Sequence, residues 1–248
     1  MTIRNEIVSY IKEEVVRQNE AGLFRVPLVG FSSPKDALYR DIKKYAGEQH
    51  VYPEEILPEV ETVVSFFIPL SMRVVESNRG RGAVSELYAQ SYISCNRLIN
   101  HISAQLVEQF RMQGYKAEMV RSTHTYDPKI LKAAWSHRSA AYIAGMGTFG
   151  LNNLLITPKG CAGRFGTVFL SAALEPDERS TEERCRYYID GSCRACVASC
   201  PTQALAEQGF DRFQCHSELM RTRARFTHLG TCDVCGKCLV GPCAILAE

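Results

Sequence analysis

The stretch CRYYIDGSCRACVASCP, from Cys185 to Pro201, places four cysteines within seventeen residues and ends in Cys-Pro. Nine of the chain's 11 cysteines lie from Cys185 onward. The N-terminus lacks the uninterrupted apolar core of a signal peptide, so we expect a protein of the cytoplasm, where disulfides are rare. Cysteines gathered in a reducing compartment predict a metal site before they predict disulfides.

The spacing of these cysteines narrows the kind of metal site. Bacterial ferredoxins bind two [4Fe-4S] clusters through runs of C-x2-C-x2-C-x3-C-P, in which the last cysteine ligates the other cluster. Cys193, Cys196 and Cys200 give C-x2-C-x3-C-P, but Asp190 takes the place of the first cysteine of such a run. Cys185 can fill that place through a longer loop. The C-terminal part therefore resembles a two-cluster ferredoxin module.

Nine cysteines compete for the eight ligand places of two such clusters. If each run lends one ligand to the other cluster, the sequence predicts two sets of four. The first set is Cys185, Cys193, Cys196 and Cys243, and the second is Cys200, Cys215, Cys235 and Cys238. This scheme leaves Cys232 spare, whereas a rival scheme uses Cys232 and releases Cys215, and spacing alone does not separate them. Two structural Zn(Cys)4 sites are a further alternative, although the C-x3-C-P spacing favours clusters.

The rest of the chain is long enough for a substantial core of its own. Of 248 residues, 46% are hydrophobic, and we expect a layered α/β core over 1–178 followed by the cluster module over 179–248. Segments 27–31, 62–70 and 115–120 are predicted strands, and 84–113 a long amphipathic helix. A second helix is predicted over 127–145, with Asp127 as its candidate N-cap, and it leads into the glycine loop AGMGTFGLNNLLIT, residues 144–157. No apolar run is long enough to cross a membrane.

Three glycines in that loop, Gly145, Gly147 and Gly150, match G-x-G-x-x-G. A dinucleotide-binding turn follows a strand and opens a helix, whereas this loop follows a helix and precedes a strand, so we set that interpretation aside. Glycines without side chains let the backbone approach a large flat ligand, although a tight turn also explains them.

Taken together, the glycine loop, the C-x2-C-x3-C-P run, the lone Cys215 and the terminal cysteines resemble the epoxyqueuosine reductase family and the catalytic core of reductive dehalogenases. This resemblance implies a nitroreductase-like core that binds cobalamin, with two clusters that pass electrons to cobalt. It also favours leaving Cys232 out of the ligand sets. The tRNA-modifying members carry a helical-repeat extension, so the resemblance points to a short branch without it.

The resemblance suggests where cofactor and substrate lie. We expect a cofactor-binding surface made of loop and helix residues, namely Gly145, Gly147, Gly150, Asn152, Tyr92 and Asn96. Candidate catalytic residues are Asp127, His137 and Arg164, of which Asp127 lies nearest to the family's acidic proton donor. In this chain Thr148 and Leu151 replace an aromatic residue and a lysine of the family's loop. Cys161 and Cys95 are interpreted as small core residues.

The predicted function is that of an iron–sulfur oxidoreductase, dependent on cobalamin, that reduces a small organic molecule. The alternative is an electron-transfer or reactivating protein that has no substrate of its own. The expected electron donor is a reduced ferredoxin or flavodoxin. The formal net charge of +2 becomes mildly negative once two clusters of about −2 each are added, so a nucleic-acid partner is not expected.

Overall fold

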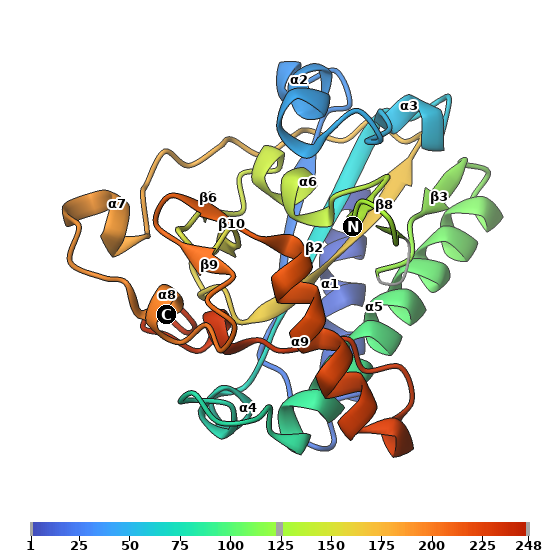
Figure 1. Ribbon diagram of the computed structural model, residues 1–248. Helices are drawn as coiled ribbons and strands as arrows, with labels where there is room; N and C mark the ends of the chain where they lie inside the picture. The colour runs from blue at the N-terminus through green and yellow to red at the C-terminus, as the bar shows by residue number, and fades with distance from the viewer. Residues whose placement is uncertain (1, 123–125, 247–248) are drawn as a thin grey trace.

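The computed structural model describes residues 2–122 and 126–246. Its centre is a four-stranded sheet in which neighbouring strands are antiparallel throughout (Figure 1). The strand order is β1 (Leu28–Ser32), β2 (Thr62–Pro69), β8 (Gly163–Leu170) and β3 (Ala117–Met119). The predicted mixture of helices and strands is confirmed, and the three predicted core strands lie at the expected places.

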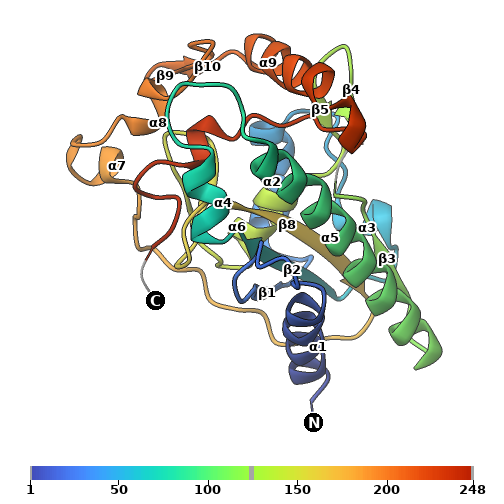
Figure 2. The same ribbon diagram turned by 90° about the horizontal axis from the view of Figure 1, so that it is seen from below.

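Both faces of this sheet are covered by helices, because side chains alternate between the faces along each strand. On β2, Val64, Phe66 and Ile68 join the apolar core that includes α1 (Ile3–Arg17) and α5 (Glu86–Met112). Val63, on the opposite face, packs with residues of α2 (Ala37–Ala46) and α6 (His137–Ile143). Every residue of β2 is buried as a result. Figure 2 shows the sheet between these two helical layers.

Two further short helices complete the N-terminal part, α3 (Pro53–Ile56) and α4 (Met72–Ser77). The predicted helix at 84–113 is confirmed as α5, which begins after Ser85, whose side chain accepts a hydrogen bond from the backbone of Tyr88. No helix in the described part of the chain combines the length and apolar character needed to span a lipid bilayer.

The helix predicted from Asp127 onward is wrong over its first ten residues. The chain instead forms a hairpin of β4 (Tyr126–Asp127) and β5 (Lys132–Ala133). The Asp127 carboxylate accepts a hydrogen bond from the backbone of Lys129 at 2.7 Å, and Leu131 takes a positive φ of 52°. The side chain thus forms a local turn that competes with the helix. Helix α6 starts only after Ser136, which caps it.

The glycine loop follows α6 and forms a small hairpin of β6 (Thr148–Phe149) and β7 (Leu155–Ile156). This confirms that the loop follows a helix and precedes a strand, unlike a dinucleotide-binding turn. Arg164 lies within β8 and not in a flexible loop, because the central strand already begins at Gly163.

The cysteine-rich part is built from short elements after a stretch, 171–184, that forms neither helix nor strand. These are α7 (Arg186–Asp190), α8 (Ala195–Ala198), β9 (Leu205–Ala206), β10 (Gly209–Phe210), α9 (Arg212–Arg225) and the 3-10 helices Thr227–Leu229 and Lys237–Leu239. Its buried Phe226, Val234 and Val240 belong to the same apolar core as α1 and α5. The cysteine-rich part thus packs directly on the sheet domain, and the division at residue 178 stays a prediction.

Candidate metal centre and adjoining polar site

The four cysteines of the predicted first set line one small cavity of about 50 Å³. Cys185 lies at the start of α7, Cys193 and Cys196 flank the start of α8, and Cys243 follows Pro242 near the end of the described chain. Apolar side chains close the cavity, among them Leu151 and Ile156 of the glycine-loop hairpin. Residues far apart in the sequence are therefore brought together around one space.

The thiols of this first set are also close enough to affect one another's ionisation. The pKa of Cys196 is raised to about 11, chiefly by burial and also by the neighbouring thiols Cys243, Cys185 and Cys193. A thiolate at Cys196 is therefore unfavourable without a metal. A bound cationic metal centre reverses that balance, because metal-bound thiols are deprotonated.

The four cysteines of the predicted second set are mutual neighbours as well. Burial raises the pKa of Cys215 to about 11, with Cys235 and Cys200 adding to the effect. Burial also raises the pKa of Cys238, with Cys235 and Cys215 as the nearest contributing thiols. Cys215, on α9, is therefore a neighbour of Cys235 and Cys238, although Cys235 lies 20 positions later in the sequence.

Cys232 lies apart from both sets. Its side chain is fully buried, and its sulfur lies 3.9 Å from the carbonyl oxygen of Ala89 on α5. Burial raises its pKa to about 11, and the neighbour that adds to this is Asp233 rather than another cysteine. The choice of Cys232 as the spare cysteine stays a prediction that this environment supports.

Within residues 2–122 and 126–246, no three side chains of His, Cys, Asp or Glu are close enough to hold a single metal ion. A cubane cluster holds its four thiolates farther apart than one tetrahedral ion does, because iron and sulfide atoms lie between them.

Asn152 lies at these cysteines. It is buried and lines the cavity of the first set, and its amide nitrogen donates to the carbonyl oxygen of Cys238 at 3.1 Å. The same nitrogen lies 3.7 Å from the sulfur of Cys161. Asn152 thus connects the glycine loop to the cysteine-rich part, whereas the sequence suggested a contact with cobalamin.

A buried lysine lies between two cysteines of the second set. Lys237 is 2% exposed, and its ammonium group donates to the carbonyl oxygens of Asn78 and Ala83 at 3.0 and 3.2 Å. Burial lowers its pKa, while the nearby Cys235 raises it. The lysine joins the loop after α4 to the cysteine-rich segment and adds positive charge beside the thiols.

A second group of polar side chains lies where α5 packs on β8. The guanidinium of Arg164 stacks on the ring of Tyr92 at 4.5 Å from its centroid, so these two predicted residues are together. Asn96, one turn after Tyr92, is 5% exposed, and its side-chain oxygen has no hydrogen-bond partner among the described residues. The Nε atom of Arg164 is also buried and has no hydrogen-bond partner among the described residues. Two buried polar atoms on this side of the sheet thus lack a hydrogen-bond partner among the described residues.

His137 begins α6 close to this group. Its Nδ1 lies 2.8 Å from the hydroxyl of Thr167, and its Nε2 lies 3.3 Å from the carbonyl oxygen of Arg121. Burial lowers the pKa of His137 to about 4, and Arg164 contributes in the same direction. The imidazole is therefore neutral near pH 7 and is already bonded at both nitrogens, which suits a structural role better than that of a proton donor.

Asp127 lies on the exposed hairpin and not at the start of a helix. Its neighbour Tyr126 has a hydroxyl 3.2 Å from Nε2 of His216 on α9, which joins the hairpin to the cysteine-rich part. Burial raises the pKa of Tyr126, with Asp233 and, more weakly, Tyr92 adding to the shift. The Tyr126–His216 pair escaped the sequence analysis because its members lie on elements 90 residues apart.

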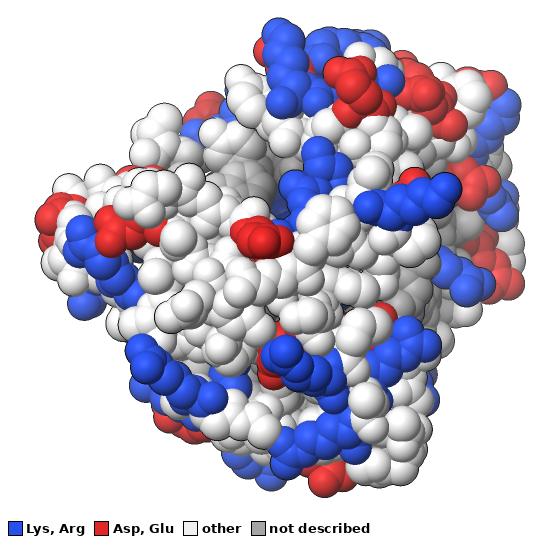
Figure 3. All heavy atoms as spheres, viewed as in Figure 1, with Lys and Arg blue, Asp and Glu red and all other residues white. Residues whose placement is uncertain are grey.

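Arg138 is a further residue that the sequence analysis missed. Surrounding protein lowers the pKa of its guanidinium although the residue is exposed to solvent, and the positive charge of Arg164 acts in the same direction. Its guanidinium donates to the carbonyl oxygen of Asn153 at 2.6 Å. Figure 3 shows a hollow between α6 and the β9–β10 hairpin, with Lys and Arg side chains beside it.

The three glycines of the loop face the chain itself. A Cβ atom on Gly147 would lie 2.2 Å from the carbonyl oxygen of Ile156, and one on Gly145 would lie 2.3 Å from that of Glu178. At Gly150 it would lie 2.7 Å from the Ile156 side chain. Packing within the hairpin explains Gly147 and Gly150, and the approach of Glu178 with a φ of 73° explains Gly145. The assignment of these glycines to cobalamin stays a prediction.

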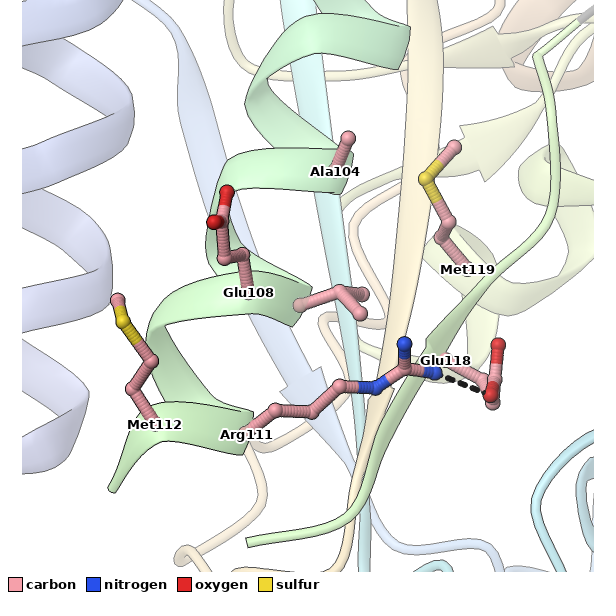
Figure 4. Close-up of a pocket in the computed structure, with 7 residues that line it drawn as sticks. Ala104, Glu108, Arg111, Met112, Glu118 and Met119 are labelled. Atoms are coloured by element: carbon pink, nitrogen blue, oxygen red, sulfur yellow. Dashed lines mark hydrogen bonds and ion pairs between the residues drawn. The ribbon is translucent and has the colours of Figure 1, made fainter. Parts of the chain in front are cut away.

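A surface pocket of about 660 Å³ lies between α5 and β3 (Figure 4). Arg111 and Glu118 form an ion pair across it. It contains none of the predicted site residues. Its size therefore gives no reason to place the functional site there.

Comparison with known proteins gives one consistent result. No model of a known protein family matches the chain. The curated epoxyqueuosine reductase of Aliivibrio fischeri is 28% identical over 204 residues, which are 82% of this chain and 51% of that protein. The chain thus spans about half the length of this relative. The predicted resemblance to epoxyqueuosine reductases is confirmed by this similarity in sequence.

Solved structures have the same fold. An epoxyqueuosine reductase in complex with a modified tRNA stem loop matches with a TM-score of 0.52 and 20% identity, over 87% of this chain and 58% of that one. A reductive dehalogenase, whose structure suggests a mechanism for B12-dependent dehalogenation, matches with a TM-score of 0.53 and 18% identity. That match covers 72% of this chain and 23% of the dehalogenase. The predicted likeness to both groups is therefore confirmed for the fold.

Proposed function

We propose that this chain is an iron–sulfur oxidoreductase that moves electrons through two [4Fe-4S] clusters toward a corrinoid and an organic substrate. The observation that carries the proposal is the cavity lined by Cys185, Cys193, Cys196 and Cys243, four residues selected from spacing alone. A second site is supported by the neighbours of Cys215 and Cys238, since Cys235 and Cys200 act on both thiols, although Cys196 of the first set also acts on Cys238.

The chemistry of both cysteine sets fits iron–sulfur clusters. Eight soft thiols in two groups of four are the ligands that two cubanes require. Binding of a cluster deprotonates its cysteine ligands, so the metal would offset the raised pKa values of Cys196 and Cys215. The amide of Asn152 and the ammonium of Lys237 lie beside the cysteines, and hydrogen bonds and charge near cluster sulfurs are what set the reduction potential. The first set would receive electrons from an external donor such as a reduced ferredoxin or flavodoxin.

The residues for a corrinoid lie on the α5 and β8 side. The unpartnered Asn96 oxygen and Arg164 Nε are suited to the amide groups of a corrinoid, and Tyr92 is suited to its apolar surface. A bound corrinoid would supply a low-potential cobalt centre. The likeness in fold to a dehalogenase with a suggested B12-dependent mechanism supports this part of the proposal.

The chain's own side chains would then bind the substrate and handle its proton. Arg138 and Arg164 form a positive pair suited to an anionic or strongly polar group of the substrate or cofactor. Asp127, on its exposed hairpin, remains the proposed proton donor, and Tyr126 next to it is held by His216. The polar site is formed by the sheet domain, and the electron path by the cysteine-rich part.

The experiment that tests this function is anaerobic reconstitution with iron and sulfide, followed by an absorbance titration with cob(II)alamin. We expect a chain with both clusters to bind cob(II)alamin, and Arg164→Leu to weaken binding while iron content is unchanged. Arg73→Leu, at an exposed arginine on α4, is the matched control. A chain that takes up iron fully and binds no corrinoid would contradict the corrinoid and favour the electron-transfer alternative.

A nucleic acid is the second candidate partner, because one solved relative in fold was obtained with a tRNA stem loop. That finding counts against the expectation of no nucleic-acid partner. Arginines also gather around α9 and the loop after α4 (Figure 3). Binding of a tRNA stem loop that weakens steeply with salt would support this candidate, and equal binding by unrelated RNA would contradict a specific substrate.

A further inference from the structure

Cys161 lies beside the first cysteine set, although it precedes the nine cysteines of the C-terminal part in the sequence. Its sulfur lies 3.7 Å from the sulfur of Cys243. The backbone fixes this approach, because the amide of Cys161 donates to the carbonyl oxygen of Cys243 at 2.9 Å, and that of Ala162 to Ala244 at 3.0 Å. The two sulfurs are therefore neighbours through the pairing of two chain segments.

The surroundings of the two thiols differ in a way that matters for their chemistry. Cys161 is 2% exposed, and its sulfur lies 3.7 Å from the side-chain amide nitrogen of Asn152. Cys243 is partly exposed and lines the cavity of the first set. A small oxidant that enters the cavity therefore meets Cys243 before it meets Cys161.

We propose that Cys161 and Cys243 form a reversible disulfide when the first cluster is lost to oxidation. This inference rests on the proposed function, because it takes Cys243 to be a cluster ligand. The sulfurs must close from 3.7 Å to roughly 2.05 Å, a change of about 1.7 Å. The pair is thus a redox-sensitive site built into the cluster-binding segment.

The oxidant is a peroxide, and the reaction balances in two steps. The thiol of Cys243 attacks one peroxide oxygen, which gives a sulfenic acid and one water. The thiol of Cys161 then attacks the Cys243 sulfur, so the S–S bond forms, the S–O bond breaks and a second water leaves. Two thiols lose two electrons in total, and one hydrogen peroxide gains them.

The disulfide has two consequences for the site. It removes one of the four ligands, so the first cluster cannot be rebuilt until a reductant opens the bond. It also stops the oxidation of Cys243 before the sulfinic and sulfonic acids, which are not reversed by thiols. The second set contains neither cysteine and keeps its four ligands.

The test uses the reconstituted chain, treated with hydrogen peroxide, blocked with N-ethylmaleimide and digested for mass spectrometry. We expect a peptide pair joined through Cys161 and Cys243. Iron for the first cluster, about four atoms per chain, should return only after treatment with a phosphine reductant. Cys161→Ser should instead give over-oxidised Cys243 and no recovery with the reductant. Cys95→Ser, at an equally buried cysteine in α5, is the control and should behave as the parent.

Two outcomes would overturn the inference. One is a parent chain in which Cys243 is over-oxidised while Cys161 stays alkylatable after unfolding. The other is a disulfide that joins Cys243 to Cys185, Cys193 or Cys196. A chain that takes up no iron before peroxide is added contradicts the cluster assignment instead. The peptides identified by mass spectrometry still show whether Cys161 and Cys243 are joined.

Discussion

Substitution of Gly147 by alanine tests the role of the glycine loop most sharply. The new Cβ would lie 2.2 Å from the carbonyl oxygen of Ile156, 2.8 Å from its carbonyl carbon and 3.0 Å from the Cα of Thr157. All three are backbone atoms of the β7 side of the hairpin, so no side-chain rotation relieves the contact. The hairpin must open, and Ile156, which lines the first cysteine cavity, must move with it.

The size of the effect follows from these contacts. Overpacking of a well-packed site costs about 1–3 kcal/mol, and a backbone clash belongs at the upper end. For a chain of this length, about 3 kcal/mol lowers the melting temperature by roughly 6–12 °C. Gly82→Ala is the matched control, because a Cβ there meets nothing within 4 Å and its φ is not positive. We expect that control to change the stability by less than about 1 kcal/mol.

The assay is thermal unfolding of the parent and both variants, followed by circular dichroism at equal iron content. A Gly147→Ala variant as stable as Gly82→Ala would refute the packing argument. Such a result would return the loop's glycines to the role of a surface for a large ligand.

Three further predictions concern individual side chains. Cys215→Ser should reduce the iron content by about half, because it removes one ligand of a four-iron cluster. Cys232→Ser should leave the iron content unchanged. The reverse pattern in iron analysis would identify Cys232 as the ligand. Lys237→Gln should lower the reduction potential of the second cluster, because it removes a buried positive charge beside Cys235. An unchanged potential in a redox titration followed by EPR would show that this charge does not act on the cluster. The pKa of His137 is lowered to about 4 in the folded chain from roughly 6.5 in the unfolded one, so its neutral form stabilises the fold above pH 6.5 and this contribution is lost as the pH falls toward 4. His137→Asn should therefore flatten the loss of stability between pH 6.5 and 4 in urea unfolding, and curves that stay parallel would contradict the assignment.

The sequence predicted the parts of this protein that depend on local pattern. Helix α5 and strand β2 follow from long periodic or apolar runs, whereas the division of the cysteines into two ligand sets stays a prediction from their spacing. The start of α6 was missed because the Asp127 side chain forms a local turn, an interaction that helix periodicity does not reveal.

Other features depend on contacts between distant segments, which one sequence does not encode visibly. Arg138, Lys237 and the Tyr126–His216 pair acquire their positions through packing of the cysteine-rich part on the sheet domain. The glycine loop shows the opposite case. Its pattern suggested an open surface for a cofactor, and the structure fills the space beside Gly145 and Gly147 with backbone.

The central claim is that the two cysteine sets hold two four-iron clusters. Its most direct test is the quantification of iron, zinc and acid-labile sulfide in the anaerobically purified chain. The account predicts about eight iron atoms and eight sulfides per chain with little zinc. About two zinc atoms per chain, with no labile sulfide, would contradict it.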